Sequence, residues 1–302
     1  RRNGEQQYAE TGKTFFQGLF FLLILAVLLC LLSKIFSPVL LKHLITSDDV
    51  YNAVIRYLDW RIWGLLFSFP FLALRSFLVG ITQTKSLNMA AFTAVLVNIP
   101  LNWLLIFGFD MGISGAAIAS SFAEMCSLAV LAAYMFRHID KKAYGLYWRI
   151  DITILKKVFS ISVWSMLQFF TSVAIWFLFF VAIERLGETE LAVSNIVRSV
   201  SALFSVIVNA LAGVTGSLVS NLIGAGEKKK VFPLCHKIIR LGYATGIPLI
   251  AFALCFHQPI IGAYTENPAI VQLTWSPFLV MLLNYFFALP GYCLLYTSPS
   301  PR

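Results

Sequence analysis

Long apolar segments separated by short polar ones make up most of this chain. Each long segment reaches the roughly 20 residues that an α-helix needs to cross a bilayer. Regular alternation of polar and apolar residues, the pattern of membrane β-strands, is absent from these segments. The pattern therefore predicts an all-α, polytopic membrane protein. The predicted spans lie near residues 14–36, 54–79, 88–108, 114–136, 158–183, 190–223, 234–257 and 269–294.

Composition supports the membrane class and argues against one alternative. Hydrophobic residues make up 59% and charged residues 12% of the chain, against about 45–50% and about 25% in soluble domains. The net charge of +9 would suggest a nucleic-acid partner in a soluble protein. Here the positive residues lie in short segments between apolar runs, as in loops that set membrane orientation. We therefore expect membrane lipid as a partner and no nucleic acid.

Lysine and arginine residues fall unevenly on the two sides of the predicted bundle. With the N-terminal segment placed in the cytoplasm, fifteen of them lie on that side and five on the other. The positive-inside rule favours this orientation, which places the N-terminal segment and residues 137–157 on the cytoplasmic face of the inner or plasma membrane. Residues 137–157 form the longest connection on that face. We interpret them as the loop between an N-terminal lobe, residues 1–136, and a C-terminal lobe, residues 158–294.

A weak internal repeat supports the division into two lobes. Gly4-Glu5 opens the basic segment before the first span, and Gly226-Glu227 opens the one before the seventh. Pro70 and Pro290 are separated by a similar offset of roughly 220 residues. Six spans, an even number, separate the related helices, so both copies face the same way. Such a parallel repeat is typical of transporters.

Residues 295–302 interrupt the last predicted span with alternating serine and proline. The repeat predicts that an apolar helix continues there. We therefore expect this tail not to be native to the fold, the alternative being a genuine C-terminus.

One carboxylate falls in the middle of a predicted span. Glu124 lies about ten residues into the span that begins near Gly115, which places it near the membrane midplane at 1.5 Å per residue. Small residues around it, such as Ala119 and Ser120, allow close helix packing, so its side chain is expected to face the bundle. Ionisable groups at this depth are costly and mark ion or proton paths. Glu124 is therefore the candidate for a coupling cation or proton, and the alternative is a carboxylate that only joins helices.

Two arginines and several amides are further candidates. Arg198 could pair with Glu124 across the lobes or extend to the outer interface. Arg75 follows the Pro70 kink and is expected at the inner interface, in a structural role. Amides within spans join helices or line a cavity. The polar cavity candidates are Asn98, Asn102, Gln168, Asn195, Arg198, Asn209 and Asn284.

Neither an enzyme nor a metal site is expected. The four histidines lie at loop or helix edges, and the chain has no GxSxG or HExxH motif. The five cysteines form no CxxC motif and no cluster with histidine, so the buried ones are expected to behave as small apolar residues. We expect no cofactor other than Na⁺ or H⁺ as a coupling ion.

Aromatic residues make up 15% of the chain. Most are expected to face lipid. Those in the spans near 158–183 and 269–294 could instead enclose a cationic, amphipathic small molecule through cation–π contacts.

Five strings occur in an order and spacing that resemble a known family. They are Arg2-Asn3-Gly4-Glu5 through Gln17-Gly18, Pro70…Leu74-Arg75…Gly80, Asn98…Asn102…Gly108…Gly112…Gly115-Ala-Ala-Ile-Ala119, Leu191-Ala-Val-Ser-Asn195 and Leu218-Val-Ser-Asn-Leu-Ile-Gly-Ala-Gly226. Together they resemble the multidrug and toxic compound extrusion (MATE) family of the MOP superfamily. The similarity extends to about residue 294.

The resemblance implies that the eight spans are helices three to ten of a twelve-helix transporter with two six-helix lobes. Such transporters take in Na⁺ or H⁺ and export drugs or other organic cations by alternating access. Two alternatives stay open: a lipid-linked oligosaccharide flippase of the same superfamily, and a non-transporting membrane scaffold. A flippase is expected to line its cavity with more cations than Arg198 and Arg75 provide.

Two departures limit what can be carried over from the family. Some members have a glutamate midway along helix seven, where this chain has Gln168 followed by Phe169. Some have an aspartate after the helix-ten proline, where Gly291 follows Pro290 here. Helix one, where another coupling aspartate often lies, is expected to be absent from this chain. Glu124 is thus a candidate from its burial and not from a family motif.

Overall fold

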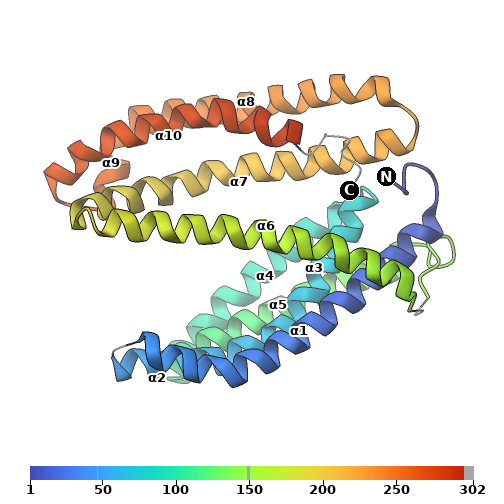
Figure 1. Cartoon of the computed structure of the whole chain (residues 1–302), viewed down its shortest axis with the longest axis horizontal. Coiled ribbons are helices and arrows are strands. Elements are labelled where there is room, and N and C mark those ends of the chain that lie inside the picture. The colour runs from blue at the N-terminus through green and yellow to red at the C-terminus, as the bar shows by residue number, and fades with distance from the viewer. Residues whose placement is uncertain (46, 148–149, 296–302) are drawn as a thin grey trace. The chain divides into compact units, whose positions relative to one another are not determined.

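A computed structural model describes residues 1–45, 47–147 and 150–295. The predicted tail lies outside the described residues from position 296 onward, as do positions 148–149 of the predicted inter-lobe loop. All regular structure in the described part is helical (Figure 1). Eight helical segments there are long and apolar enough to cross a membrane. The predicted all-α, polytopic class is confirmed.

The helices extend past the apolar segments that predict them. The first, α1 (Tyr8–Leu44), is much longer than the predicted span at 14–36. The second span begins at Asp48, where the hydroxyl oxygen of Ser47 accepts a hydrogen bond from the backbone N–H of Val50. Asp48 and Asp49 lie in its first turn, where carboxylates favour the positive end of the helix dipole. Apolar content locates the membrane crossing, whereas caps and end charges locate the helix ends.

The chain divides into two compact units. The N-terminal unit contains Arg2 and Gln6–Ser160, and the C-terminal unit contains Arg1, Asn3–Glu5 and the residues from Ile161 onward.

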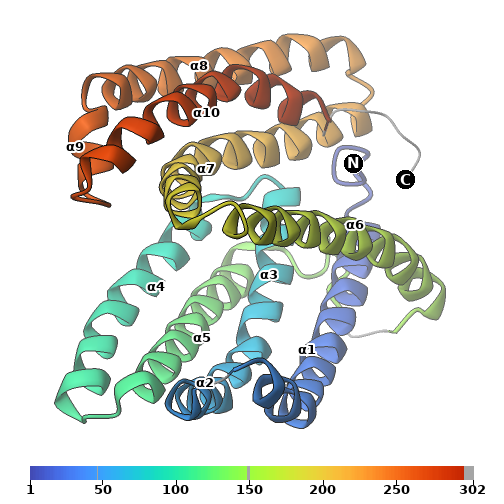
Figure 2. The same ribbon diagram turned by 60° about the vertical axis from the view of Figure 1, so that its left-hand side comes forward.

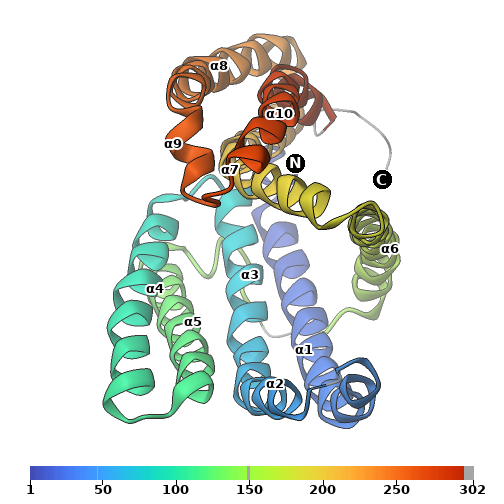
Figure 3. The same ribbon diagram turned by 90° about the vertical axis from the view of Figure 1, so that its left-hand side faces the viewer.

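Four spans make up most of the N-terminal unit. Within it α4 packs on α5, α5 on α3, and α3 on α1, so the spans follow one another in the order α4, α5, α3, α1 (Figures 2 and 3). α2, η1 and α3 together form one span, Asp48–Gly80. The remaining bounds are α2 (Asp48–Arg61), η1 (Ile62–Gly64), α3 (Leu65–Gly80), α4 (Lys85–Trp103), the π-helical turn η2 (Leu104–Gly108) and α5 (Gly112–His138).

Small residues on α5 bring its backbone close to its neighbours. A Cβ atom on Gly115 would lie 2.9 Å from the carbonyl carbon of Leu105 in η2, closer than real Cβ atoms approach, so only glycine fits. Ala117, Ala119 and Ala123 on the same helix are buried. This close packing holds the middle of α5, where Glu124 lies, against the adjacent spans.

The C-terminal unit is built around α7, which packs on both α8 and α10 (Figure 1). Phe204 of α7 and Phe278, Leu282 and Leu289 of α10 are buried in its core. No residue of α6 is buried. The bounds are α6 (Ile152–Glu184), α7 (Glu188–Gly224), η3 (Lys228–Lys230), α8 (Val231–Cys255), α9 (His257–Gly262) and α10 (Pro268–Leu295).

A tyrosine on α8 satisfies the backbone that a proline leaves unpaired in α10. Pro290 has no N–H, so the carbonyl of Phe286, four residues earlier, loses its partner within the helix. The hydroxyl of Tyr243 donates a hydrogen bond to that carbonyl, at 2.8 Å. The side-chain bond replaces the missing backbone bond and joins α8 to α10.

Replacing Tyr243 by phenylalanine is expected to lower the free energy of unfolding by about 1 kcal/mol, since the carbonyl is then left without a donor in an apolar surrounding. The thermal unfolding midpoint in detergent measures the change. Tyr292→Phe is the control, because Tyr292 lies on α10, the helix that accepts the Tyr243 hydrogen bond, and is exposed. Equal midpoints for the two variants would contradict the assignment.

Candidate functional site

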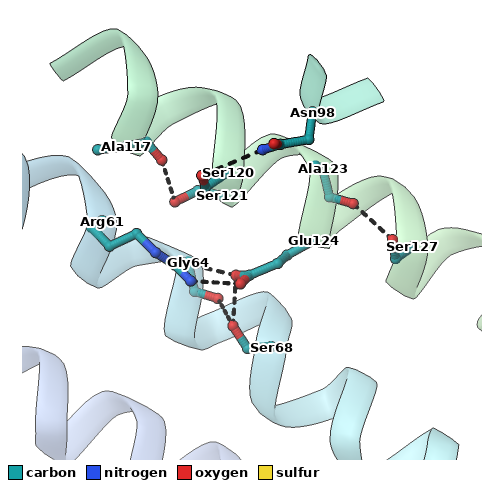
Figure 4. Close-up of polar contacts among 10 residues, drawn as sticks. All are labelled: Arg61, Gly64, Ser68, Asn98, Ala117, Ser120, Ser121, Ala123, Glu124 and Ser127. Carbon is teal, nitrogen blue, oxygen red and sulfur yellow. Dashed lines mark hydrogen bonds and ion pairs between the residues drawn. The ribbon is translucent and has the colours of Figure 1, made fainter. Parts of the chain in front are cut away.

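Glu124 of α5 forms a bidentate ion pair with Arg61, the last residue of α2 (Figure 4). Arg61 Nη2 lies 2.6 Å from Oε1 of the carboxylate, and Arg61 Nη1 lies 3.0 Å from Oε2. Paired N–H groups that meet both oxygens of a carboxylate give the strongest and most directional form of this contact. The two side chains are 28% and 30% exposed.

Ser68 of α3 is the third member of the cluster. Its hydroxyl oxygen lies 2.6 Å from Glu124 Oε2 and 2.8 Å from the carbonyl oxygen of Gly64. A serine hydroxyl carries one hydrogen, so it donates to one of these two acceptors at a time. The choice of acceptor depends on the charge of the carboxylate, because an ionised acceptor attracts the proton more strongly than a neutral carbonyl.

Gly64 makes room for the pair. A Cβ atom at this position would collide with Arg61 Nη1 and lie 3.0 Å from Glu124 Oε2. It would also lie 2.8 Å from the hydroxyl oxygen of Ser121 on α5. Arg61, Gly64 and Ser68 follow one another at intervals of three and four residues, the spacing that places side chains on one helical face. The cluster therefore joins the second span to α5 within the N-terminal unit.

The pairing differs from the one considered from the sequence. Arg198, the partner considered there, lies in the C-terminal unit and donates to Asn195 Oδ1 at 3.1 Å. Its guanidinium also lies 4.9 Å from the ring centre of Phe180. From the sequence, Arg61 is one of the five basic residues predicted on the outer side and is not a site candidate. Its place three residues before Gly64 and seven before Ser68 puts it on their helical face, but this spacing does not point to a partner on α5.

The amides Asn98 and Asn102 form a polar connection between α4 and α5. Asn102 Nδ2 donates to Asn98 Oδ1 at 2.9 Å. Asn98 Nδ2 lies 3.4 Å from the hydroxyl oxygen of Ser120 (Figure 4). Both asparagines are half-buried. Their four-residue spacing on one face, expected from the sequence, produces this contact.

The other candidate side chains are exposed. Arg75 lies on the exposed side of α3, and Gln168, Asn209 and Asn284 are exposed on α6, α7 and α10. Arg75 belongs to the N-terminal unit, and Gln168, Asn209 and Asn284 belong to the C-terminal unit. Among the described residues, no group of three His, Cys, Asp or Glu side chains could hold a metal ion.

These features define a multi-pass helical membrane protein with a half-buried ion pair inside one span bundle. The MatE family model matches residues 1–104 and 165–297, and the chain belongs to that family. The resemblance noted in the sequence is thereby confirmed. Arg61 and Ser68 lie within the matched segments, whereas Glu124 lies between them.

Curated relatives are similar over most of this chain. It is 26% identical over 294 residues to the probable multidrug resistance protein NorM of Shewanella oneidensis, covering 93% of this chain and 62% of that protein. It is 23% identical over 243 residues to the multidrug resistance protein NorM of Vibrio cholerae, covering 77% and 53%. The chain thus spans about half to three-fifths of the length of these relatives.

Solved structures show the same fold. One is an outward-facing multidrug resistance MATE family transporter of the MOP superfamily, with a TM-score of 0.82 and 20% identity, covering 98% of this chain and 69% of that one. Another is the eukaryotic MATE transporter AtDTX14, with a TM-score of 0.78 and 20% identity, covering 98% and 66%.

Proposed function

We propose that this chain supplies helices three to ten of a twelve-helix exporter in the inner or plasma membrane. The exporter takes in Na⁺ or H⁺ and moves drugs or other amphipathic organic cations outward. Membership of the MatE family and similarity to proteins named for multidrug resistance support export of small molecules. The N-terminal segment and residues 137–157 face the cytoplasm in this proposal, with residues 1–136 and 158–294 as the moving lobes.

The Arg61–Glu124–Ser68 cluster is the observation that carries the coupling part of the proposal. Arg61 contacts both oxygens of the Glu124 carboxylate, so an incoming cation or proton must displace at least one of those contacts. Displacement leaves the guanidinium free and lets the Ser68 hydroxyl turn to Gly64. The cluster therefore has two arrangements, one with the ion pair and one with the carboxylate occupied by the coupling ion.

The surroundings of the carboxylate suit either ion. The hydroxyl oxygen of Ser68 lies 2.6 Å from Glu124 Oε2 and 2.8 Å from the carbonyl oxygen of Gly64, and hard cations take oxygen ligands. A proton needs only the carboxylate itself. In both cases the ion acts by binding one arrangement better than the other, because a ligand of equal affinity for both states shifts nothing.

Transport then follows alternating access, in which two repeats move around a central site. The substrate is proposed to contact amides of both lobes, Asn98 and Asn102 on one side and Gln168, Asn195, Asn209 and Asn284 on the other. Arg198 lies beside the Phe180 ring. Arg75 is proposed to hold the inner end of α3 in place.

Replacing Glu124 by glutamine in the full-length protein is expected to reduce gradient-driven drug export at least tenfold. Glutamine has nearly the same shape but neither binds a proton in the working range nor carries the charge that attracts a cation. Export is measured in proteoliposomes with a fluorescent cationic drug. Asp110→Asn, which removes the same charge from an exposed turn, is the control.

A monodisperse peak for Glu124→Gln in fluorescence-detected size exclusion would show that the variant is folded, so that its loss of export reflects lost coupling. Unchanged export by this variant would remove Glu124 from the coupling site. An aggregated peak would show that the carboxylate serves only to join helices.

A further inference from the structure

The turn between α7 and α8 carries a groove that the export function does not use. Its walls are Leu218 and Leu222 of α7, Leu234 of α8, and the loop residue Gly4, and it encloses about 330 Å³. Asn221 and Ala225 complete its lining. Both helices are long and apolar enough to cross a membrane, so the turn that joins them is expected at the level of the membrane surface.

Close contacts within the C-terminal unit hold the lining of the groove in place. Asn3 Nδ2 donates to Asn221 Oδ1 at 2.8 Å. A Cβ atom on Gly4 would collide with the carbonyl oxygen of Asn221, and one on Gly224 would collide with the carbonyl oxygen of Arg1. The backbone of the N-terminal loop therefore packs directly against the backbone at the end of α7. The loop forms one side of the groove.

A group of positive charges stands beside this apolar groove. Lys228, Lys229 and Lys230 form the short helix η3 and are all exposed. Lys230 is bound to Glu227 at 2.7 Å, so three ammonium groups and one carboxylate leave a net charge of +2 over residues 227–230. Phe232, two residues after the last of these lysines, is 76% exposed.

We propose that this turn binds an anionic phospholipid. The headgroup phosphate lies against Lys228 and Lys229, and an acyl chain lies in the groove between Leu218, Leu222 and Leu234. Basic residues beside transmembrane helices attract anionic headgroups, while the apolar lining removes the chain from water. The lipid thereby ties the ends of α7 and α8 to the leaflet predicted to be cytoplasmic. A zwitterionic lipid has no net charge to match the lysines and binds more weakly.

The proposal is tested by lipid binding to the full-length protein in a neutral detergent. Phosphatidylglycerol is titrated, with phosphatidylcholine and inorganic phosphate in parallel, and bound lipid is counted by native mass spectrometry. The double variant Lys228→Gln/Lys229→Gln is expected to bind phosphatidylglycerol roughly tenfold more weakly. Lys156→Gln/Lys157→Gln, which removes two exposed lysines at the start of α6, is expected to bind it unchanged.

A second variant tests the contribution of the groove to lipid binding while the lysine charges stay unchanged. Ala225→Trp adds a ring to the groove lining and keeps every lysine, and it is expected to weaken phosphatidylglycerol binding as well. Equal binding of phosphatidylcholine and phosphatidylglycerol, or full binding by the lysine double variant, would overturn the proposal. Competition by inorganic phosphate at the same concentration as the lipid would also overturn it, because the acyl chain would then contribute nothing.

Discussion

Replacing Arg61 by alanine is expected to lower the free energy of unfolding by about 2 kcal/mol. Removing one partner of a fully buried ion pair costs about 3–5 kcal/mol, because the other charge stays buried without compensation. Here the two side chains are 28% and 30% exposed, so the pair is only partly buried and a smaller cost is expected. The thermal unfolding midpoint of the full-length protein in detergent measures it.

Two further variants test whether the loss comes from the unpaired carboxylate. Arg56→Ala removes an exposed arginine from the same helix and is expected to change the midpoint little. The double variant Arg61→Gln/Glu124→Gln removes both charges and is expected to recover part of the stability lost by Arg61→Ala. Equal midpoints for Arg61→Ala and Arg56→Ala would show that the ion pair adds nothing to stability.

Replacing Gly246 by alanine is expected to lower the free energy of unfolding by about 3 kcal/mol, the upper range for an extra group forced into a packed core. The new methyl would overlap the ring of Tyr285 on α10. That ring is 3% exposed, and its hydroxyl donates to the carbonyl of Gly242 at 2.8 Å. The ring therefore has nowhere to move without losing this bond.

Gly213→Ala is the matched control for this prediction. Gly213 lies inside α7, and a Cβ atom there would meet nothing within 4 Å. Alanine favours a helix interior over glycine by about 1 kcal/mol, so this variant is expected to be as stable as the parent or slightly more so. If both alanine variants behaved alike, the close packing of α8 against Tyr285 would be refuted.

The membrane class followed directly from the sequence, whereas the helix ends did not. Apolar content alone marks where a chain crosses lipid, and it located all eight spans. It carries no information on where a helix continues into the interface. The start at Asp48, fixed by the Ser47 cap, depends on local hydrogen bonds that a hydropathy pattern does not contain.

The sequence predicts the position of Glu124 in the candidate site but not its partner. Burial of Glu124 against small residues was evident from Ala119, Ser120 and Ala123, because their spacing leaves one face of α5 open to close packing. Its partner was not evident, since Arg61 lies 63 residues away along the chain and next to a polar segment. A pair so distant in sequence is set by how the second span packs on α5, which no single-helix pattern specifies.

The exposure of α6 shows a second limit of the hydrophobic pattern, which does not tell which face of a helix packs on protein. Its long apolar pattern predicts a span, and the helix is present. The same pattern also predicts possible cavity roles for Gln168 and the aromatic residues near it, and these stay predictions; their side chains are exposed in the C-terminal unit. Hydrophobicity in a membrane helix does not distinguish a face toward lipid from a face toward protein, because lipid tails are as apolar as leucine.

The most direct test of the central claim is drug uptake into inverted membrane vesicles that contain the full-length protein. Ethidium is added, and either a pH gradient or a Na⁺ gradient is applied. Cation-coupled export predicts uptake under one of the two gradients and its loss when that gradient is collapsed, which also identifies the coupling ion. No uptake under either gradient would contradict drug antiport and would favour a flippase or another substrate class.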